Sequence, residues 1–211
     1  MAKKQTIDKN KIIEVAIDLF NEKGYAATSI RDISRVMKIS IASLYYYFHD
    51  KEELLFTIVE DMGNQLLHDL TEAKDLAENS LDGLRQMMTK HILLTEKSHK
   101  KAKIFVEEKH NLSKKSWRIV HEQDRKVYDM IMNQLREIQK LGIISIDSLP
   151  IAAFAIFGVI NWCYRWYKKD GPLSIEEVSE RLVNIIFHGI VKPEKQSPKK
   201  RSLPSRPSTK G

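Results

Sequence analysis

The chain has 211 residues, 42% of them hydrophobic, a composition that excludes a disordered chain and allows a small module beside a larger core. Only 8 residues are Gly and 6 are Pro, and four of the prolines fall in residues 192–211. The remaining chain holds only Pro150 and Pro172, so we expect an all-helical fold without a sheet. The single cysteine, Cys163, excludes an intrachain disulfide and a cysteine-rich zinc site.

The net charge of +7 lies mostly at the C-terminal end. Residues 192–211 hold seven Lys and Arg against one Glu, which leaves a net charge of only +1 for the preceding residues. This basic tail is rich in Pro and Ser, so we expect it to be disordered, and its deletion should leave any DNA sequence preference intact. Composition is therefore weak evidence for nucleic-acid binding, and stronger evidence has to come from a sequence motif.

The spacing of apolar residues predicts helices in chain order. The first three lie at about 6–23, 30–37 and 40–48, and a long helix follows Asp50, with an apolar stripe that reaches Leu70. Further helices are expected at about 81–98, 101–111, 113–141, 148–168 and 174–191. Gly24 ends the first helix, Ser29 or Thr28 caps the second, and Ser40, Asp50 and Ser174 cap later ones. We divide the chain into a small N-terminal domain over 1–52, a larger helical domain over 53–191, and the tail over 192–211.

The chain shows no apolar signal segment in its first residues, MAKKQTID. Its longest apolar run, residues 151–160, is too short to span a bilayer and is typical of a buried helix. We therefore expect a cytoplasmic protein.

The two short helices over 30–37 and 40–48, joined by a tight turn at Lys38-Ile39 and preceded by a longer helix, have the pattern of a helix-turn-helix. The second short helix, SIASLYYYF, has no charged residue and would read bases in the major groove through Ser40, Ile41, Ser43 and Tyr45. Arg31 would reach a base or a phosphate. The candidates for phosphate contacts are Thr28, Ser43, Tyr46, Tyr47 and Lys51.

The three consecutive tyrosines could also be ordinary packing residues. Successive helical side chains point about 100° apart, so all three cannot face one core. An exposed phenol at Tyr46 or Tyr47 would suit a phosphate oxygen, which accepts its hydrogen bond.

The segment GYAATSIRDISRVMKISIASLYYYFHDKEELL resembles the N-terminal signature of TetR-family regulators, over roughly residues 7–60. The resemblance implies a repressor rather than an enzyme, a palindromic double-stranded operator, a homodimer formed through the last two helices, and a ligand pocket in the C-terminal domain. Lys38 and Ala42 stand where the family often has Gly, so the operator sequence stays open.

Polar residues interrupt the apolar faces of the C-terminal helices, and such residues need partners or a ligand. The interruptions that we take as candidate ligand contacts are His91, His121, Asp124, Tyr128, Asn161 and Arg165. Neighbouring side chains would satisfy them equally well if no ligand binds.

The segments INWCYRWYKKDGPLSIEEVSERL and IFVEEKHNLS resemble a TetR-family branch that senses acyl-CoA thioesters. The resemblance implies an acyl-CoA effector, with Trp162 and Trp166 as apolar surface and Arg165 on a phosphate or the thioester. Both tryptophans would otherwise be core or dimer-interface residues.

Three alternatives remain open from the sequence. A multidrug sensor that controls an efflux pump would also suit the aromatic residues, although cationic drugs would favour buried carboxylates, and Asp124 is the one clear candidate. A di-iron enzyme would use Glu96 with His99 and Glu107 with His110, although these pairs lie among lysines. A helical adaptor would show no salt-dependent DNA binding. We expect no metal and no cofactor.

Overall fold

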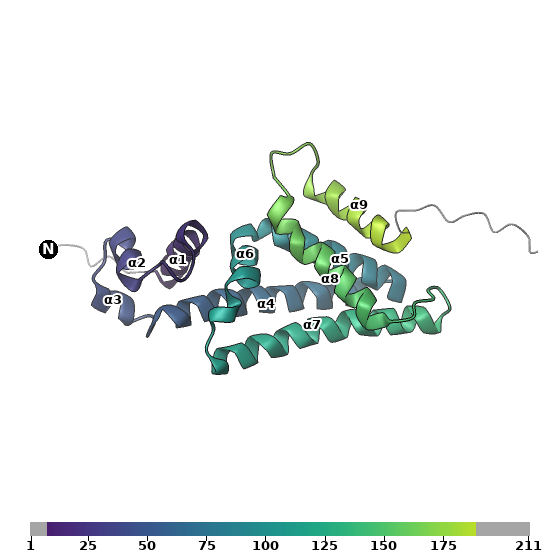
Figure 1. Ribbon diagram of the computed structural model, residues 1–211, viewed down its shortest axis with the longest axis horizontal. Helices are drawn as coiled ribbons and strands as arrows, with labels where there is room; N and C mark the ends of the chain where they lie inside the picture. Colours follow the sequence, from purple (N-terminus) through teal and green to yellow (C-terminus); the bar gives the residue numbers. More distant parts are fainter. Residues whose placement is uncertain (1–7, 189–211) are drawn as a thin grey trace, which may run out of the picture.

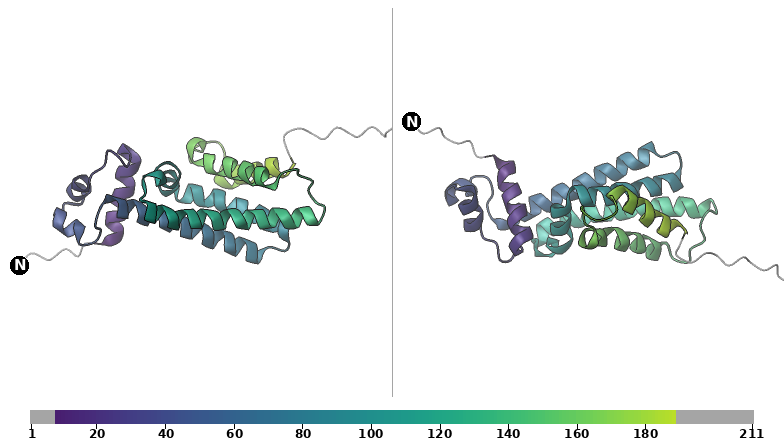
Figure 2. Two further views of the ribbon diagram at one scale, coloured as in Figure 1. Left: turned by 60° about the horizontal axis from the view of Figure 1, so that its bottom comes forward. Right: turned by 90° about the horizontal axis from the view of Figure 1, so that it is seen from above.

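The computed structural model describes residues 8–188, and this part of the chain is helical without a strand (Figure 1). The elements are α1 Lys9–Lys23, α2 Ile30–Met37, α3 Ile41–Tyr45, α4 Lys51–Leu76, α5 Ser80–Lys97, α6 His99–Glu107, η1 Lys109–Asn111, α7 Lys114–Lys140, α8 Leu149–Trp166 and α9 Ile175–His188. The first three form a small head, and α4 runs from it into an elongated body (Figure 2). The expected all-α fold, with a helix-turn-helix head and a helical body, is confirmed.

Side-chain caps set most helix starts, as the sequence predicts. Ser29 and Asp32 form a reciprocal capping box at α2, Ser40 accepts from the Ser43 amide at α3, and Asp50 accepts from the Glu53 amide at α4. These bonds satisfy amide groups that have no partner inside the first helical turn.

The head has its own hydrophobic core, which continues into the body. Leu44 and Phe48 anchor the third helix and the turn after it, and both are almost fully buried. The same core includes Val59 on α4 and also Ile104 and Val120 from α6 and α7. No linker therefore separates the two expected domains, because one continuous helix, α4, serves both cores.

The body core begins at Met62 on α4 and is completed by α5, α7, α8 and α9. Helices α4 and α7 lie side by side along the body, and α9 packs on α5 (Figure 1). A buried glutamine, Gln123 of α7, donates to Asn64 Oδ1 at 2.7 Å. Gly63 makes room for it, since a Cβ at this position would lie 2.6 Å from Gln123 Oε1.

Two predicted helices differ from the structure. The third ends at Tyr45 instead of residue 48, because Tyr46 and Tyr47 form a turn that leads to Asp50. The predicted helix over 101–111 is an α-helix up to Glu107, followed by the short 3₁₀ helix η1. The basic tail over 192–211 lies outside the described residues.

The prediction that α8 is a buried helix is wrong for one of its faces. Ile151 and Phe154 are 71% and 65% exposed, and Trp162 is 56% exposed. Among the described helices, α8 is the one long and apolar enough to cross a membrane by length and composition, which core helices of water-soluble folds also satisfy. Its inner face, with Ile156 and Ile160, packs into the body core.

Candidate functional site

The helix-turn-helix is formed by α2, a tight turn and α3. Lys38 takes the left-handed conformation, with φ at 54°, and its amide donates to the Arg35 carbonyl. A left-handed residue lets the chain reverse within two residues, which explains why glycine suits this position. Ser40 then starts α3 at once.

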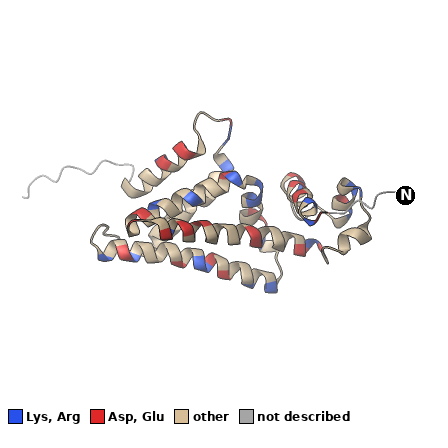
Figure 3. Ribbon diagram, turned by 180° about the vertical axis from the view of Figure 1, so that it is seen from behind, with Lys and Arg blue, Asp and Glu red and all other residues tan. Residues whose placement is uncertain are grey.

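The outer surface of α3 is polar and aromatic and carries no charge, so the helix is entirely tan in Figure 3. Tyr46 is 84% exposed, while Tyr45 and Ile41 are partly exposed. The Ser40 and Ser43 hydroxyl oxygens lie 2.7 Å apart at the start of the helix. This surface offers hydroxyls and apolar contacts to base edges, and charge has to come from neighbouring elements.

Arg31 supplies such a charge from α2, where its side chain is exposed. Tyr47 is half-buried and its ring meets that of Tyr46 edge-on, with centroids 5.1 Å apart. Tyr46 is therefore the more accessible of these two candidates for a phosphate.

Thr28 and Lys51 have structural roles that the sequence did not reveal. The Thr28 hydroxyl is buried and donates to the Gly24 carbonyl at 2.9 Å, so it already has a partner inside the protein, and its phosphate contact stays a prediction. Lys51 Nζ donates to the Tyr25 carbonyl at 2.6 Å and lies over the Tyr25 ring. Partial burial lowers the pKa of Lys51. Both residues hold the loop between α1 and α2 in place.

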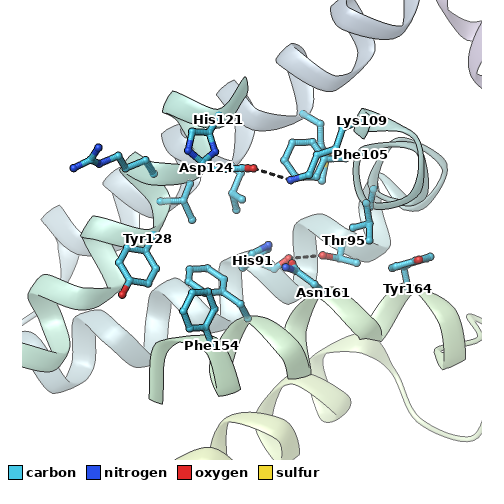
Figure 4. Close-up of a pocket in the computed structure, with 17 residues that line it drawn as sticks. His91, Thr95, Phe105, Lys109, His121, Asp124, Tyr128, Phe154, Asn161 and Tyr164 are labelled. Atoms are coloured by element: carbon cyan, nitrogen blue, oxygen red, sulfur yellow. Dashed lines mark hydrogen bonds and ion pairs between the residues drawn. The ribbon is translucent and has the colours of Figure 1, made fainter. Parts of the chain in front are cut away.

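The body contains a cavity of about 440 Å³ between α4, α5, α6, α7 and α8 (Figure 4). This volume falls within the range of about 300–1,000 Å³ that is typical of small-molecule sites. Most of the wall is apolar, with Met62 and Leu66 from α4, Phe105 from α6, and Phe154 and Phe157 from α8.

Two groups of polar residues lie on opposite sides of the cavity. On one side, Lys109 Nζ pairs with Asp124 Oδ2 at 2.7 Å and lies over the Phe105 ring (Figure 4). On the other side are His91 and Asn161, and the Thr95 hydroxyl donates to the His91 carbonyl at 2.9 Å.

His91 is the most perturbed titratable group in this cavity. It is 7% exposed, and burial lowers the pKa of its imidazole to about 4. The ring is therefore neutral at physiological pH and offers one hydrogen-bond donor and one acceptor.

Five of the eight candidate ligand residues line this cavity: His91, His121, Asp124, Tyr128 and Asn161. The structure does not bring the remaining three, Trp162, Arg165 and Trp166, to it. They lie on the outer part of α8, where Arg165 is stacked over the Trp162 ring and pairs with Glu107 at 3.6 Å. The apolar spacing of α8 could not separate its two faces, since both are apolar.

Several cavity residues were missed by the sequence reasoning. Lys109 and Phe105 both belong to the segment IFVEEKHNLS, whose family resemblance was the one signal pointing to them. Phe157 and Leu66 gave no signal, because an apolar residue that faces a cavity follows the same periodicity as one that faces a core.

Helix α6 lies between this cavity and the head. Phe105 and Val106 face the cavity, whereas Glu108, just after the helix, accepts a hydrogen bond from the Tyr25 amide at 3.2 Å. Lys100 pairs with Asp18 of α1 at 2.6 Å. Any shift of α6 on ligand binding would therefore act directly on the head.

The two Glu-x-x-His pairs have other partners in the structure. Glu96 pairs with Lys169 at 3.5 Å, and Glu107 accepts from the Tyr164 hydroxyl at 2.9 Å. Within the described residues, no group of three or more His, Cys, Asp or Glu side chains is arranged to hold a metal ion.

The chain is similar to known bacterial regulators over both parts. Residues 12–58 match the family model of bacterial regulatory proteins of the tetR family, and residues 77–190 match that of the tetracyclin repressor-like C-terminal domain. The HTH-type transcriptional repressor KstR2 of Mycolicibacterium smegmatis is 26% identical over 184 residues, which cover 86% of this chain and 90% of that repressor.

Two solved structures are similar over most of the chain. PfmR from Thermus thermophilus is 27% identical, with a TM-score of 0.80, over 88% of this chain and all of that one. AibR, crystallised with isovaleryl coenzyme A and operator DNA, is 28% identical, with a TM-score of 0.77, over 84% of this chain and 97% of that one. With its head and body both matched, the chain belongs to the TetR family and is a DNA-binding transcriptional regulator, not an enzyme.

Proposed function

We propose that this TetR-family repressor binds a palindromic operator as a homodimer, and that a CoA thioester in the body cavity releases it from DNA. The observation that carries the proposal is the position of α6, which has the cavity on one side and contacts to α1 and the α1–α2 loop on the other. A ligand acts on DNA binding only if it favours one arrangement of the two reading heads over the other.

Two features support a CoA thioester as the effector. The cavity is apolar enough for an acyl chain, and Arg125, an exposed cation that lines it, would bind a phosphate of CoA. The similar regulator AibR was crystallised with isovaleryl coenzyme A. The regulated genes would then concern acyl-CoA or fatty-acid metabolism in the cytoplasm.

A multidrug sensor is the weaker proposal. Cationic drugs need an unpaired buried carboxylate. Asp124, the one carboxylate that lines the cavity, is already paired with Lys109 at 2.7 Å.

The exposed apolar face of α8, formed by Ile151, Trp162 and Trp166, would be covered by the second copy, together with Ile185 of α9. An apolar patch of this kind marks an interface more often than open surface. We assign Trp162, Arg165 and Trp166 to this dimer face rather than to the acyl cavity. Trp162→Glu should then produce monomers in sedimentation analysis, whereas Trp117→Glu, at a similarly exposed tryptophan of α7, should leave the dimer intact.

Release from DNA is tested by fluorescence anisotropy on DNA from upstream of the gene, titrated with isovaleryl-, octanoyl- and palmitoyl-CoA. We expect at least one thioester to reverse binding, while free CoA and the free acids do not. Val106→Phe, which fills the cavity, should weaken this release, and Ile119→Phe, equally exposed but outside the cavity, should not. If no thioester reverses tight DNA binding, CoA thioesters are excluded as the effector, while the function as a repressor stands.

Arg165→Ala separates the two roles of the outer α8 residues. Because Arg165 lies outside the cavity, we expect thioester-driven release to persist in this variant. If the variant still dimerises but the thioester no longer releases it from DNA, Arg165 contacts the ligand after all.

A further inference from the structure

His91, one of the two buried polar residues that line the cavity, has no hydrogen-bond partner for its imidazole among the described residues. The ring is 7% exposed and meets the edge of Phe157, with centroids 6.5 Å apart. The nearby Thr95 hydroxyl donates its proton to the His91 backbone carbonyl instead. Figure 4 shows His91, Thr95 and Asn161 together, across the cavity from the Lys109–Asp124 pair.

An unpartnered imidazole constrains what can fill this cavity. Water can satisfy the ring while the cavity is empty of ligand, but a hydrocarbon chain would displace that water and supply no partner. A buried polar group left without a partner weakens binding by about tenfold or more. The preferred ligand therefore carries a polar atom at this position.

The polar atom should also be uncharged. Burial keeps the imidazole neutral, so it cannot neutralise a ligand carboxylate. Lys109, a cation that lines the same cavity, lies on the opposite side and is already paired with Asp124 at 2.7 Å. A carbonyl oxygen would accept from the N–H of the neutral ring, and a hydroxyl could accept from that N–H or donate to the other ring nitrogen.

We propose that His91 is a specificity-determining residue that hydrogen-bonds a neutral oxygen of the ligand, a carbonyl or hydroxyl, and so selects oxygenated ligands over pure hydrocarbons of the same shape. This inference rests on the proposed function in that the ligand occupies the same cavity. The oxygen belongs either to the thioester carbonyl or to a substituent on the acyl chain, and both sources present the same chemistry to the ring.

The first experiment uses small probes without CoA. Cyclohexyl methyl ketone and isopropylcyclohexane have the same shape, with the ketone oxygen replaced by a methyl group. Dissociation constants come from NMR titrations that follow the imidazole resonances of the full-length protein. The two probes also differ in hydrophobicity, which acts equally in wild type and in a variant without the imidazole. The ratio of the hydrocarbon's dissociation constant to the ketone's should therefore be about tenfold larger in wild type than in His91→Leu.

Variants show whether His91 causes this preference. His91→Leu should lose this tenfold contribution, and His91→Gln, which keeps a donor and an acceptor, should retain part of it. Phe157→Leu changes the same wall without a polar group and should alter both affinities by a similar factor. The same ratio of dissociation constants in wild type and in His91→Leu would overturn the proposal.

The second experiment identifies the source of the oxygen with three CoA compounds. If the thioester carbonyl meets His91, wild type should discriminate octanoyl-CoA from the S-octyl-CoA thioether, and His91→Leu should not. If a substituent on the acyl chain meets His91 instead, wild type should discriminate 3-hydroxyoctanoyl-CoA from octanoyl-CoA, and His91→Leu should lose this discrimination. If no CoA compound binds or releases DNA, the proposed effector fails, while the ketone pair still decides the role of His91.

Discussion

Acid should destabilise this protein through one buried histidine. Burial lowers the pKa of His91 from its ordinary value of 6.5 to about 4, so the unfolded chain takes up a proton between these values that the folded chain does not. The stabilisation is therefore fully present above pH 6.5 and is lost as the pH falls toward 4. A pKa lowered by this amount corresponds to about 3 kcal/mol of unfolding free energy, of which about 2 kcal/mol is lost by pH 5.

The assay is urea unfolding followed by circular dichroism at pH 7, 6 and 5, with wild type compared with His91→Leu. Because other groups titrate in the same range, the informative quantity is the unfolding free energy of wild type minus that of His91→Leu, which should fall by about 2 kcal/mol from pH 7 to pH 5. The ionisable groups that share the cavity, Asp124, Lys109, His121 and Arg125, are retained in both proteins. His68→Leu, at an exposed histidine of α4, should keep the wild-type pH dependence. Parallel stability curves for wild type and His91→Leu would refute a buried, neutral His91.

Four further predictions follow from single contacts. Gly63→Ala should lower the unfolding free energy by about 1–3 kcal/mol, since its Cβ would meet Gln123 Oε1 at 2.6 Å, and Gln123→Ala should restore it in urea titrations. Lys38→Gly should raise stability by up to about 1 kcal/mol, because φ is 54° there; a loss in thermal unfolding would contradict this. Tyr46→Phe should weaken operator binding several-fold in anisotropy without changing stability, as the side chain is 84% exposed. Glu108→Ala should leave thioester binding intact in calorimetry but reduce its effect on DNA affinity, and an undiminished effect would exclude this contact as a link.

The sequence predicted the head well because its signals are local. The capping box at Ser29 and Asp32, the cap at Ser40 and the cap at Asp50 each involve residues three positions apart. Such bonds form within one helical turn, so a pattern of residues in the chain is enough to place them. The fate of Thr28 was not predictable in this way, because its hydroxyl bonds to the Gly24 carbonyl only once the loop has folded.

The ligand cavity was only partly predictable. Polar residues that interrupt apolar faces, such as His91 and Asn161, were visible in the sequence and do line it. The sequence did not show whether Asp124 was available to a cationic ligand, because its partner Lys109 lies 15 residues away on another element.

The sequence by itself determined the helical fold, the helix-turn-helix and the family, because apolar periodicity and capping are properties of neighbouring residues. Only the tertiary structure decided which apolar faces are covered. Helix α8 is apolar on both faces, and the packing of α5, α6 and α7 turns Ile156 inward and leaves Trp162 exposed. A cavity walled by five helices likewise has no signature in any one of them, because it arises where side chains from distant segments fail to fill the space between them.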